Sequence, residues 1–289
     1  MSSFELPAPG LHLKRTLSCG QAFRWTWAGR WARGVVGRTV LWLEPMPGHL
    51  RVHPEGEPLG PEAVRAYLFG GGPVRAAERR LCSDPVLRQI LPLTRGISLL
   101  AQHPWEALCS FLISQNNNIP KIRLSIERLC RALGERIPAR GEAFTFPSPE
   151  RIAEAPPRIL RDAALGYRAP YLRATARLVA DRLVDLEALR RASLEEARTA
   201  LLALPGVGEK VAECVLLFGL GHREAFPVDV WVRRAVLELY FRGRARTPRE
   251  IRTWARERFG PLAGLAQQHL YHFARTSWGF GRDRRGEAV

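Results

Sequence analysis

The sequence has few cysteines and no paired arrangement of them. Its five cysteines are scattered along 289 residues, and no C-x-x-C pair is present that could hold zinc or an iron–sulfur cluster. The seven histidines lack nearby carboxylate or thiol partners that would complete a metal site. We therefore expect a reduced compartment and no catalytic metal.

Long apolar runs are also missing. No opening stretch resembles a signal peptide, and no run approaches the roughly 18 uninterrupted apolar residues that a membrane span requires. The 46% of hydrophobic residues is nevertheless enough to bury a sizeable core. We expect a folded, cytoplasmic protein with no membrane partner.

Lysine is scarce although the chain is strongly basic. The formal net charge of +16 favours a nucleic-acid partner, because neutralising phosphates with release of counterions dominates nucleic-acid affinity. An arginine-rich proteome is the alternative explanation. Only Lys14, Lys121 and Lys210 stand among the 44 basic residues. Because lysine can lose its proton and arginine cannot, each lysine is a candidate for chemistry that needs a free amine.

The apolar pattern changes near residue 60. Residues from about 10 to 55 carry short apolar runs broken by glycine, including LHLKRTL, QAFRWTW and RTVLWLE, which predict short antiparallel strands. Residues 54–61 are predicted to be a linker. Beyond them, apolar residues recur at intervals of three and four, which predicts helices, and residues 281–289 are expected to fray.

The predicted fold class is therefore α+β. A small N-terminal antiparallel β-rich domain is expected over residues 1–60, extending to about 95 if flanking helices join it. A mostly helical region of two subdomains is expected over residues 61–289.

The segment LLALPGVGEKVAECVLLFGL, residues 201–220, predicts two helices joined by a tight turn. A helix-hairpin-helix is accordingly expected at about 194–220. Gly206 and Gly208 leave bare amides at the start of the second helix, which is typical of a phosphate-binding turn. A joint kept short only for packing is the alternative.

Lys210 and Asp229 are the two candidates for catalysis. Lys210 falls in the first turn of the second hairpin helix, where the positive end of the helix dipole disfavours a protonated ammonium. Asp229 follows Pro227 and Val228 directly before an apolar-periodic helix, so its ordinary role would be an N-cap. A carboxylate held there could also stabilise a developing sugar cation. Taken alone, a lysine at this position is more often an exposed surface residue than a nucleophile.

The pair LPGVGEK and PVDV resembles the helix-hairpin-helix, Gly/Pro-Asp superfamily of DNA repair glycosylases, and no cysteine follows Cys214 to supply the iron–sulfur loop of one branch. The segments SCGQAFRW, ISQNNNIPKI, LGYRAPY and FGPLAGLAQQHLY occur in the order found in 8-oxoguanine DNA glycosylases. The resemblance implies a bifunctional enzyme of base excision repair. It would remove 8-oxoguanine through a Schiff base on Lys210, with Asp229 as its partner, and then cut the strand as an AP lyase.

The resemblance also implies how the damaged base is read. The carbonyl of Gly20 would accept from the hydrogen that the oxidised base carries on N7, where guanine has a lone pair. Gln267 would contact the Watson–Crick edge. Tyr271 and Cys214 would lie against the two faces of the base. Gln267 and Tyr271 are four residues apart, so a helix places them on one face. Without the resemblance, Tyr271 and Cys214 would be interpreted as core residues and Gly20 as a turn glycine.

The remaining implied contacts concern the gap left in the duplex. Asn116 and Asn117, with Asn118 beside them, would bind the orphaned base, although a helix cap is the alternative. Tyr167 and Arg168 resemble the wedge that enters the gap.

Two positions depart from the family pattern. Lys121 stands where an arginine commonly reads the opposite cytosine, and an ammonium cannot make the same forked contact. Trp231 stands where a histidine commonly contacts phosphate. Because of the lysine at position 121, discrimination between opposite bases is expected to be relaxed.

The expected partner is double-stranded DNA containing an oxidised purine, bound by a monomer that needs no cofactor. The resemblance further implies a structural monovalent cation held by carbonyls of the hairpin. Two alternatives stay open: an enzyme of the same fold that removes alkylated bases by water attack, and a non-catalytic hairpin module that only binds DNA.

Overall fold

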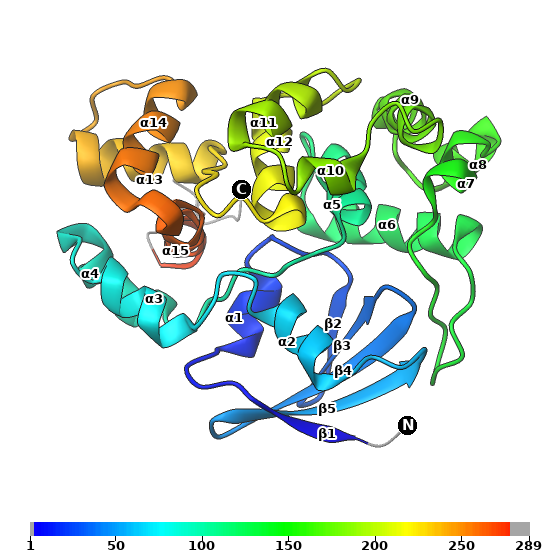
Figure 1. Cartoon of the computed structure of the whole chain (residues 1–289), viewed down its shortest axis with the longest axis horizontal. Coiled ribbons are helices and arrows are strands. Elements are labelled where there is room, and N and C mark those ends of the chain that lie inside the picture. The colour runs from blue at the N-terminus through cyan, green and yellow to red at the C-terminus, as the bar shows by residue number, and fades with distance from the viewer. Residues whose placement is uncertain (1–2, 278–289) are drawn as a thin grey trace, which may run out of the picture.

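The computed structural model describes residues 3–277, so the expected fraying of residues 281–289 lies outside the described part. Five antiparallel strands form one sheet in the order β1-β5-β4-β3-β2. Helices make up most of the chain beyond it (Figure 1). The predicted α+β class is confirmed.

The sheet belongs to the N-terminal part of the chain. Its strands are β1 (Phe4–Pro7), β2 (Trp25–Ala28), β3 (Trp31–Val36), β4 (Thr39–Met46) and β5 (His49–Gly56). Two helices accompany them, α1 (Leu13–Ser18) and α2 (Pro61–Leu68). Because β5 extends to Gly56, the predicted linker begins inside a strand, and residues 57–60 alone connect the sheet to α2.

The helical part follows α2. Its elements are α3 (Val74–Leu81), α4 (Pro85–Thr94), α5 (Pro104–Ile113), α6 (Ile119–Leu133), α7 (Pro149–Ala153), α8 (Pro157–Asp162), α9 (Arg168–Ala180), α10 (Leu186–Leu189), α11 (Leu194–Leu202), α12 (Glu209–Val215), the π-helix η1 (Leu216–Leu220), α13 (Val230–Phe241), α14 (Pro248–Phe259), the 3₁₀ turn η2 (Gly260–Leu262) and α15 (Ala263–Thr276). Within residues 3–277, every helix is too short or too polar to span a lipid bilayer.

One predicted strand is wrong. The run LHLKRTL forms α1 rather than a strand, although its first three residues alternate. Leu13, Thr16 and Leu17 are the residues it buries, and their spacing is that of a helix. The side chain of His12 caps this helix by accepting from the amide of Arg15. The strand β1 was not predicted, because it precedes the residues from about 10 to 55 in which strands were expected.

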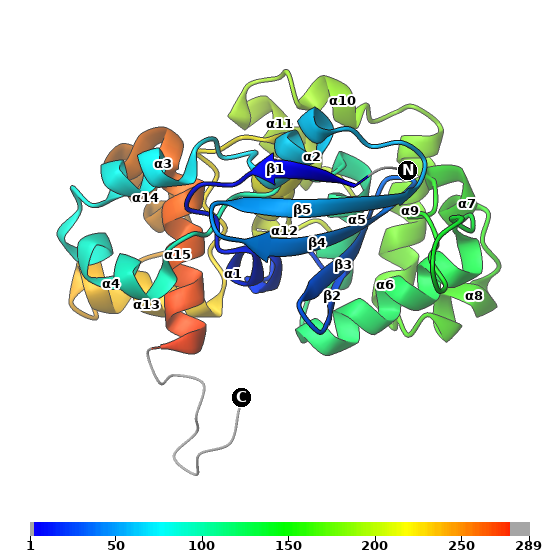
Figure 2. The same ribbon diagram turned by 90° about the horizontal axis from the view of Figure 1, so that it is seen from below.

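The chain has two main hydrophobic cores, one at the sheet and one among the helices. One face of the sheet buries Leu41, Leu43 and Val52 together with residues of α1 and α2. A second, larger core joins the helices from α3 onward. Figure 2 shows the sheet in front of the helical body, with α3 and α4 beside α13, α14 and α15. The helix-hairpin-helix formed by α11 and α12 lies within this larger core, as predicted.

Candidate active site

Lys210 lies near the start of α12, where Gly208 is the N-cap. Its Nζ donates to Ser114 Oγ at 3.1 Å and lies 5.3 Å from the ring centroid of Phe111, both contributed by the end of α5. Lys210 interacts electrostatically with Asp229 and Cys214. The structure therefore brings the predicted nucleophile and its predicted partner to one place.

Asp229 is the N-cap of α13, as its position before the helix predicted. Its carboxylate accepts from the amide of Val232 at 2.8 Å, which fixes its orientation. Burial raises the pKa of Asp229, while the amide of Val232 and the charge of Lys210 oppose that rise. The carboxylate is thus rigidly held and poorly solvated, so an adjacent positive charge would interact strongly with it.

Gly20 and Tyr271 are in contact although they lie at opposite ends of the chain. Gly20 has φ of +77°, and a Cβ placed there would lie 2.9 Å from Tyr271 Oη. The hydroxyl of Tyr271 accepts from Arg275 Nη1 at 3.0 Å, and the guanidinium lies 5.4 Å from the ring centroid. Burial raises the pKa of Tyr271 to about 12, which keeps the phenol neutral.

Gln267 and Cys214 complete the expected base-reading set. Gln267 lies one turn before Tyr271 on α15, so both side chains share a helix face as predicted. Its amide donates to the carbonyl of Pro227 at 3.2 Å and accepts from Gln268 at 2.8 Å. Cys214 lies one turn after Lys210, and burial raises the pKa of its thiol to about 11.

The residues expected at the strand gap form a second group. Asn116 has φ of +45° and donates from Nδ2 to Tyr167 Oη at 3.1 Å. Tyr167 is 52% exposed, so its ring is available to DNA. The third asparagine, Asn118, is the N-cap of α6 and accepts from the amide of Lys121 at 3.0 Å. The side chain of Lys121 is exposed.

Asn117 and Arg168 are engaged within the protein. Asn117 donates to the carbonyl of Ile113 at 3.2 Å. Arg168 is buried, and its guanidinium donates to the carbonyls of Gln115 and Asn116. These contacts tie the asparagine loop to the start of α9. Arg168 is therefore placed to hold the loop that carries Asn116.

Glu213 links the elements that carry Lys210 and Asp229, and it was not predicted. It is buried on α12, where Oε1 accepts from Arg198 Nε at 2.7 Å and Oε2 accepts from the amide of Phe226 at 2.8 Å. Phe226 begins the segment that leads to Asp229. One carboxylate therefore joins both hairpin helices to the segment that leads to Asp229. A glutamate within the largely apolar run VAECVLLFGL was the available signal.

Ser114 and Arg275 also lie at the candidate site, and little in the sequence pointed to them. Ser114 lies two residues before the asparagine run but is 96 residues from Lys210. Arg275 lies one turn after Tyr271, in line with Gln267 on the same helix. Their roles depend on tertiary contacts that the sequence does not display.

The hairpin turn has the geometry expected of its glycines. Gly206 has φ of +76°, and a Cβ there would lie 2.6 Å from Tyr171 Cγ. Gly208 has open space around it, so its amide is accessible at the start of α12. The carbonyl of Pro205 accepts from Thr175 Oγ1 at 3.2 Å. The structural cation expected here stays a prediction.

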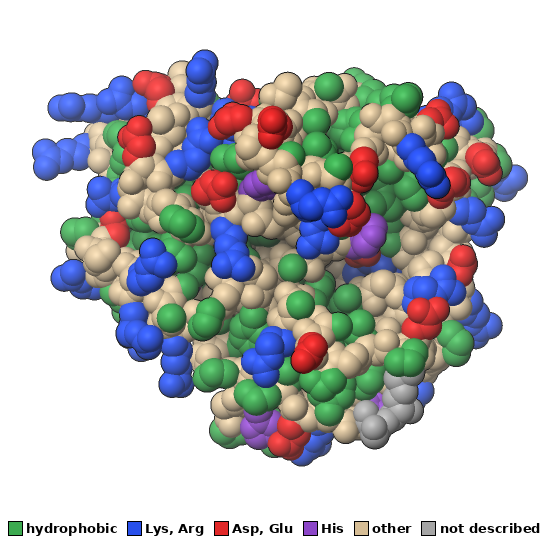
Figure 3. Space-filling model, in the orientation of Figure 1, with side chains coloured by type: hydrophobic (Ala, Val, Ile, Leu, Met, Phe, Trp, Pro, Cys, Tyr) green, Lys and Arg blue, Asp and Glu red, His purple; other side chains and the backbone are tan. Residues whose placement is uncertain are grey.

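Acidic and thiol side chains do not gather into a metal site in the part of the chain that is described. No group of three or more His, Cys, Asp or Glu side chains within residues 3–277 is placed to hold a metal ion. Basic side chains are spread over the surface instead. Figure 3 shows blue side chains projecting from the left edge, over α13 and α14. This distribution suits a polyanionic partner.

The chain matches a family of DNA repair proteins. Residues 109–261 match the HhH-GPD superfamily base excision DNA repair protein family. The matched region contains the hairpin, Lys210 and Asp229.

Three similar proteins extend the match to most of the chain. A probable N-glycosylase/DNA lyase of Methanothermobacter thermautotrophicus is 36% identical over 224 residues, covering 70% of this chain and 71% of the relative. N-glycosylase/DNA lyase OGG1 of Arabidopsis thaliana is 32% identical, covering 90% and 76%. The 8-oxoguanine glycosylase/lyase of Clostridium acetobutylicum, in complex with double-stranded DNA containing cytosine opposite 8-oxoG, superposes with a TM-score of 0.86 at 30% identity and covers 92% of each chain.

Proposed function

The chain belongs to the HhH-GPD superfamily of base excision DNA repair proteins, and we propose that it excises 8-oxoguanine through an amine attack by Lys210. It is a DNA N-glycosylase with an associated lyase activity, like the relatives that it matches over most of its length. The proposed chemistry is supported by the positions of Lys210 near the start of α12 and Asp229 at the start of α13, where the charge of Lys210 acts on the carboxylate of Asp229.

The first step replaces the bond to the base. The neutral amine of Lys210 forms a bond to C1′ of the sugar, the C1′–N9 bond breaks, and its electron pair leaves with the base. Asp229 stabilises the positive charge that develops on the sugar. Its rigid N-cap geometry means that little reorganisation is needed at that moment. Ser114 holds the amine in place before the nucleotide arrives.

The second step breaks the strand. The amine linked to C1′ loses a proton as the sugar ring opens, which leaves a Schiff base between Lys210 and C1′. Removal of a proton from C2′ then expels the 3′ phosphate by β-elimination. Water then hydrolyses the Schiff base and frees Lys210, so the products are the free base and a nicked strand that ends in the unsaturated sugar remnant.

The damaged base is proposed to enter between Cys214 and Tyr271. The Gly20 carbonyl would accept from the N7 hydrogen, and Gln267 would bind the Watson–Crick edge. The contacts of Gln267 with Pro227 and Gln268 support this role, because they fix the orientation of the amide before the base arrives. The thiol of Cys214 stays protonated at neutral pH, since burial raises its pKa to about 11.

The strand gap is proposed to be filled by Tyr167, with Asn116 and Asn117 close to the orphaned base. Arg168 would hold the asparagine loop, and the exposed Lys121 would approach the opposite base. Gly206 and Gly208 would bind a phosphate of the lesion strand. Because all these residues come from one chain and supply each step, we propose a monomer that acts without a cofactor.

The function is tested by measuring free base and nicked strand separately on a duplex with 8-oxoguanine opposite cytosine. We expect the wild type to produce both, and Asp229→Asn to lower base release by about 10²- to 10³-fold, because it removes one electrostatic stabiliser of the transition state. Asp185→Asn is the matched control, since Asp185 is also an aspartate N-cap but belongs to α10.

The alternatives give different results. A module that only binds DNA would release no base in any variant. An enzyme using water attack would keep releasing base in Lys210→Gln while making no nick. Either result would contradict the amine mechanism.

A further inference from the structure

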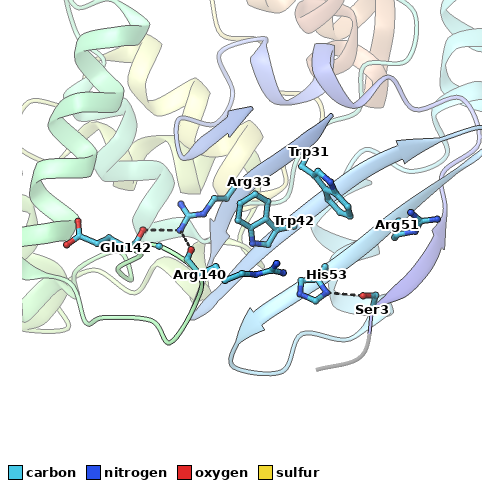
Figure 4. A pocket seen from close by; sticks show the side chains of 9 residues that line it. Ser3, Trp31, Arg33, Trp42, Arg51, His53, Arg140 and Glu142 are labelled. Atoms are coloured by element: carbon cyan, nitrogen blue, oxygen red, sulfur yellow. Dashed lines mark hydrogen bonds between the residues drawn. The ribbon is translucent and has the colours of Figure 1, made fainter. Parts of the chain in front are cut away.

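The outer face of the sheet carries a groove that the proposed reaction does not use. The groove has a volume of about 820 Å³, and the side chains that line it are drawn in Figure 4. Trp31 and Arg33 come from β3, Trp42 from β4, and Arg51 and His53 from β5. The volume falls within the roughly 300–1,000 Å³ typical of ligand sites.

Strand alternation explains why these side chains point outward together. Arg33, Trp42 and His53 are partners across the three strands in the sheet register. Their neighbours Ala32 and Leu43 point to the opposite face and are buried in the sheet core. The strand register therefore forms the groove by placing these side chains together on the outer face of the sheet.

A loop from the helical part closes one side of the groove. Arg140, on this loop, pairs with Glu55 at 2.5 Å and lies 5.9 Å from the ring centroid of Trp42. Arg33 donates to the carbonyls of Arg140 and Glu142 and lies 5.6 Å from the same centroid. The loop and the strand are thus held together around an indole.

The charge of the groove is positive. Glu44 is shared between Arg51, at 2.9 Å, and Arg30, at 2.7 Å, so one carboxylate faces two guanidinium groups. Arg33 makes no ion pair with a carboxylate in the described part of the chain, and its partners are carbonyl oxygens. Among the described residues that line the groove, Glu142 is the one with a carboxylate side chain, and it pairs with Arg131 at 2.6 Å. The lining arginines Arg33, Arg51 and Arg140 outnumber it, which leaves guanidinium charge for an anion.

We propose that this groove binds unpaired nucleotides of a single DNA strand. Indole rings and guanidinium groups together match a nucleotide, because bases stack on aromatic faces and phosphates bind arginine. Trp31 would supply the stacking face, with phosphates at Arg33 and Arg51. An intact duplex hides the faces of its bases, so an unpaired strand is the form that suits this groove.

The groove is separate from the proposed active site. The helices α1 and α2 pack against the opposite face of the sheet, and Lys210 lies in the helical part beyond it. Figure 2 looks onto the sheet and shows α12 behind it. Strand binding in the groove can therefore succeed or fail independently of base excision.

The test uses the full chain and a fluorescein-labelled single strand of eight thymidines, which contains no purine and is not a substrate. Anisotropy titration gives its dissociation constant. We expect Trp31→Ala to weaken binding by roughly 5- to 150-fold, the range that loss of one stacked base corresponds to. Arg33→Ala should weaken it and lower the log–log salt slope by about 0.7, the value for one phosphate contact on a single strand.

Two control variants keep the result interpretable. Trp31→Phe retains an aromatic face and should recover most of the affinity lost in Trp31→Ala. Arg65→Ala removes the same charge as Arg33→Ala from an exposed site on α2, and should change the affinity less than twofold.

Three outcomes would overturn the proposal. One is equal affinity of wild type, Trp31→Ala and Arg33→Ala, which would place the strand elsewhere on the protein. Another is full competition by free thymidine monophosphate at equal nucleotide concentration, which would make the ligand a mononucleotide. The third is equally effective competition by a heptaglutamate peptide, which would make the groove a site for acidic protein segments.

Discussion

Replacing Gly20 by alanine tests the geometry proposed for the base-binding pocket. The new Cβ would lie 2.9 Å from Tyr271 Oη and 3.2 Å from Cε1, closer than such atoms normally approach. Tyr271 cannot yield freely, because its hydroxyl accepts from Arg275 and its ring packs partly buried against the large helical core. The ring or the Gly20 turn must therefore shift.

Two contributions set the size of the effect. Alanine at φ of +77° costs about 1–2 kcal/mol of folding free energy, because an L side chain is strained in the left-handed region. A displacement approaching 1 Å at the base-reading carbonyl or ring would lower the rate by about 10²-fold. We therefore expect kcat/KM for 8-oxoguanine excision to fall about 10- to 100-fold, with only a modest loss of stability.

Gly29→Ala is the matched control. Gly29 also has a positive φ, +60°, but a Cβ there meets nothing within 4 Å. Urea unfolding and single-turnover excision are measured for both variants. Both should lose similar stability, and only Gly20→Ala should lose excision. Unchanged excision in Gly20→Ala, or an equal loss in Gly29→Ala, would refute the assignment of Gly20 to the pocket.

The remaining predictions concern charge and proton uptake. Burial raises the pKa of Asp229, so the stability gained from its protonated form is present below its ordinary value of 3.8 and lost as pH rises through the folded-state pKa. Asp229→Asn should therefore melt at a higher temperature than wild type at pH 7, with the difference shrinking in acid; calorimetry at pH 7 and pH 4 checks both. Burial lowers the pKa of His269 to about 3. The stability that comes from burying the neutral imidazole is therefore fully present above pH 6.5 and is lost as pH falls toward 3. The free energy of unfolding falls by up to about 1.4 kcal/mol per pH unit in that range. Urea unfolding from pH 7 to pH 5 should show a flatter pH dependence in His269→Gln. Lys121→Arg should sharpen the preference for cytosine opposite the lesion, because a guanidinium can make two parallel hydrogen bonds; a panel of four duplexes, one for each opposite base, measures the ratio.

The catalytic pair could be predicted from the sequence because its signals are local. The glycine turn places Lys210 in the first turn of a helix, and Asp229 precedes an apolar-periodic helix as an N-cap does. The i and i+4 spacing of Gln267 and Tyr271 likewise predicted their shared helix face. Each of these inferences needed only a few neighbouring residues.

Other features depend on contacts between distant segments. Ser114 accepts a hydrogen bond from Lys210, which is 96 residues away in the sequence, and no pattern near either residue predicts this contact. The run LHLKRTL begins with the alternation of a strand, but it forms a helix that packs against the sheet. Leu, Lys and Arg are good helix formers, so local propensity and tertiary burial agree at α1, and the short alternation of apolar residues was the misleading signal.

The groove on the sheet shows the same limit. Trp31, Arg33 and Trp42 were visible as members of strands, but their common face depends on the register between β3 and β4. The loop carrying Arg140 comes from about 100 residues further along the chain, as its contact with Arg33 shows. Register and loop placement were beyond the reach of sequence pattern alone.

The central claim is that Lys210 forms the covalent intermediate. Borohydride reduction during reaction with an 8-oxoguanine duplex should trap one protein–DNA adduct, and peptide mapping should place it on Lys210. The mapping is decisive because the only other lysines are Lys14 and Lys121. We predict no adduct with Lys210→Gln. An adduct that persists in Lys210→Gln, or that maps to another residue in the wild type, would contradict the account.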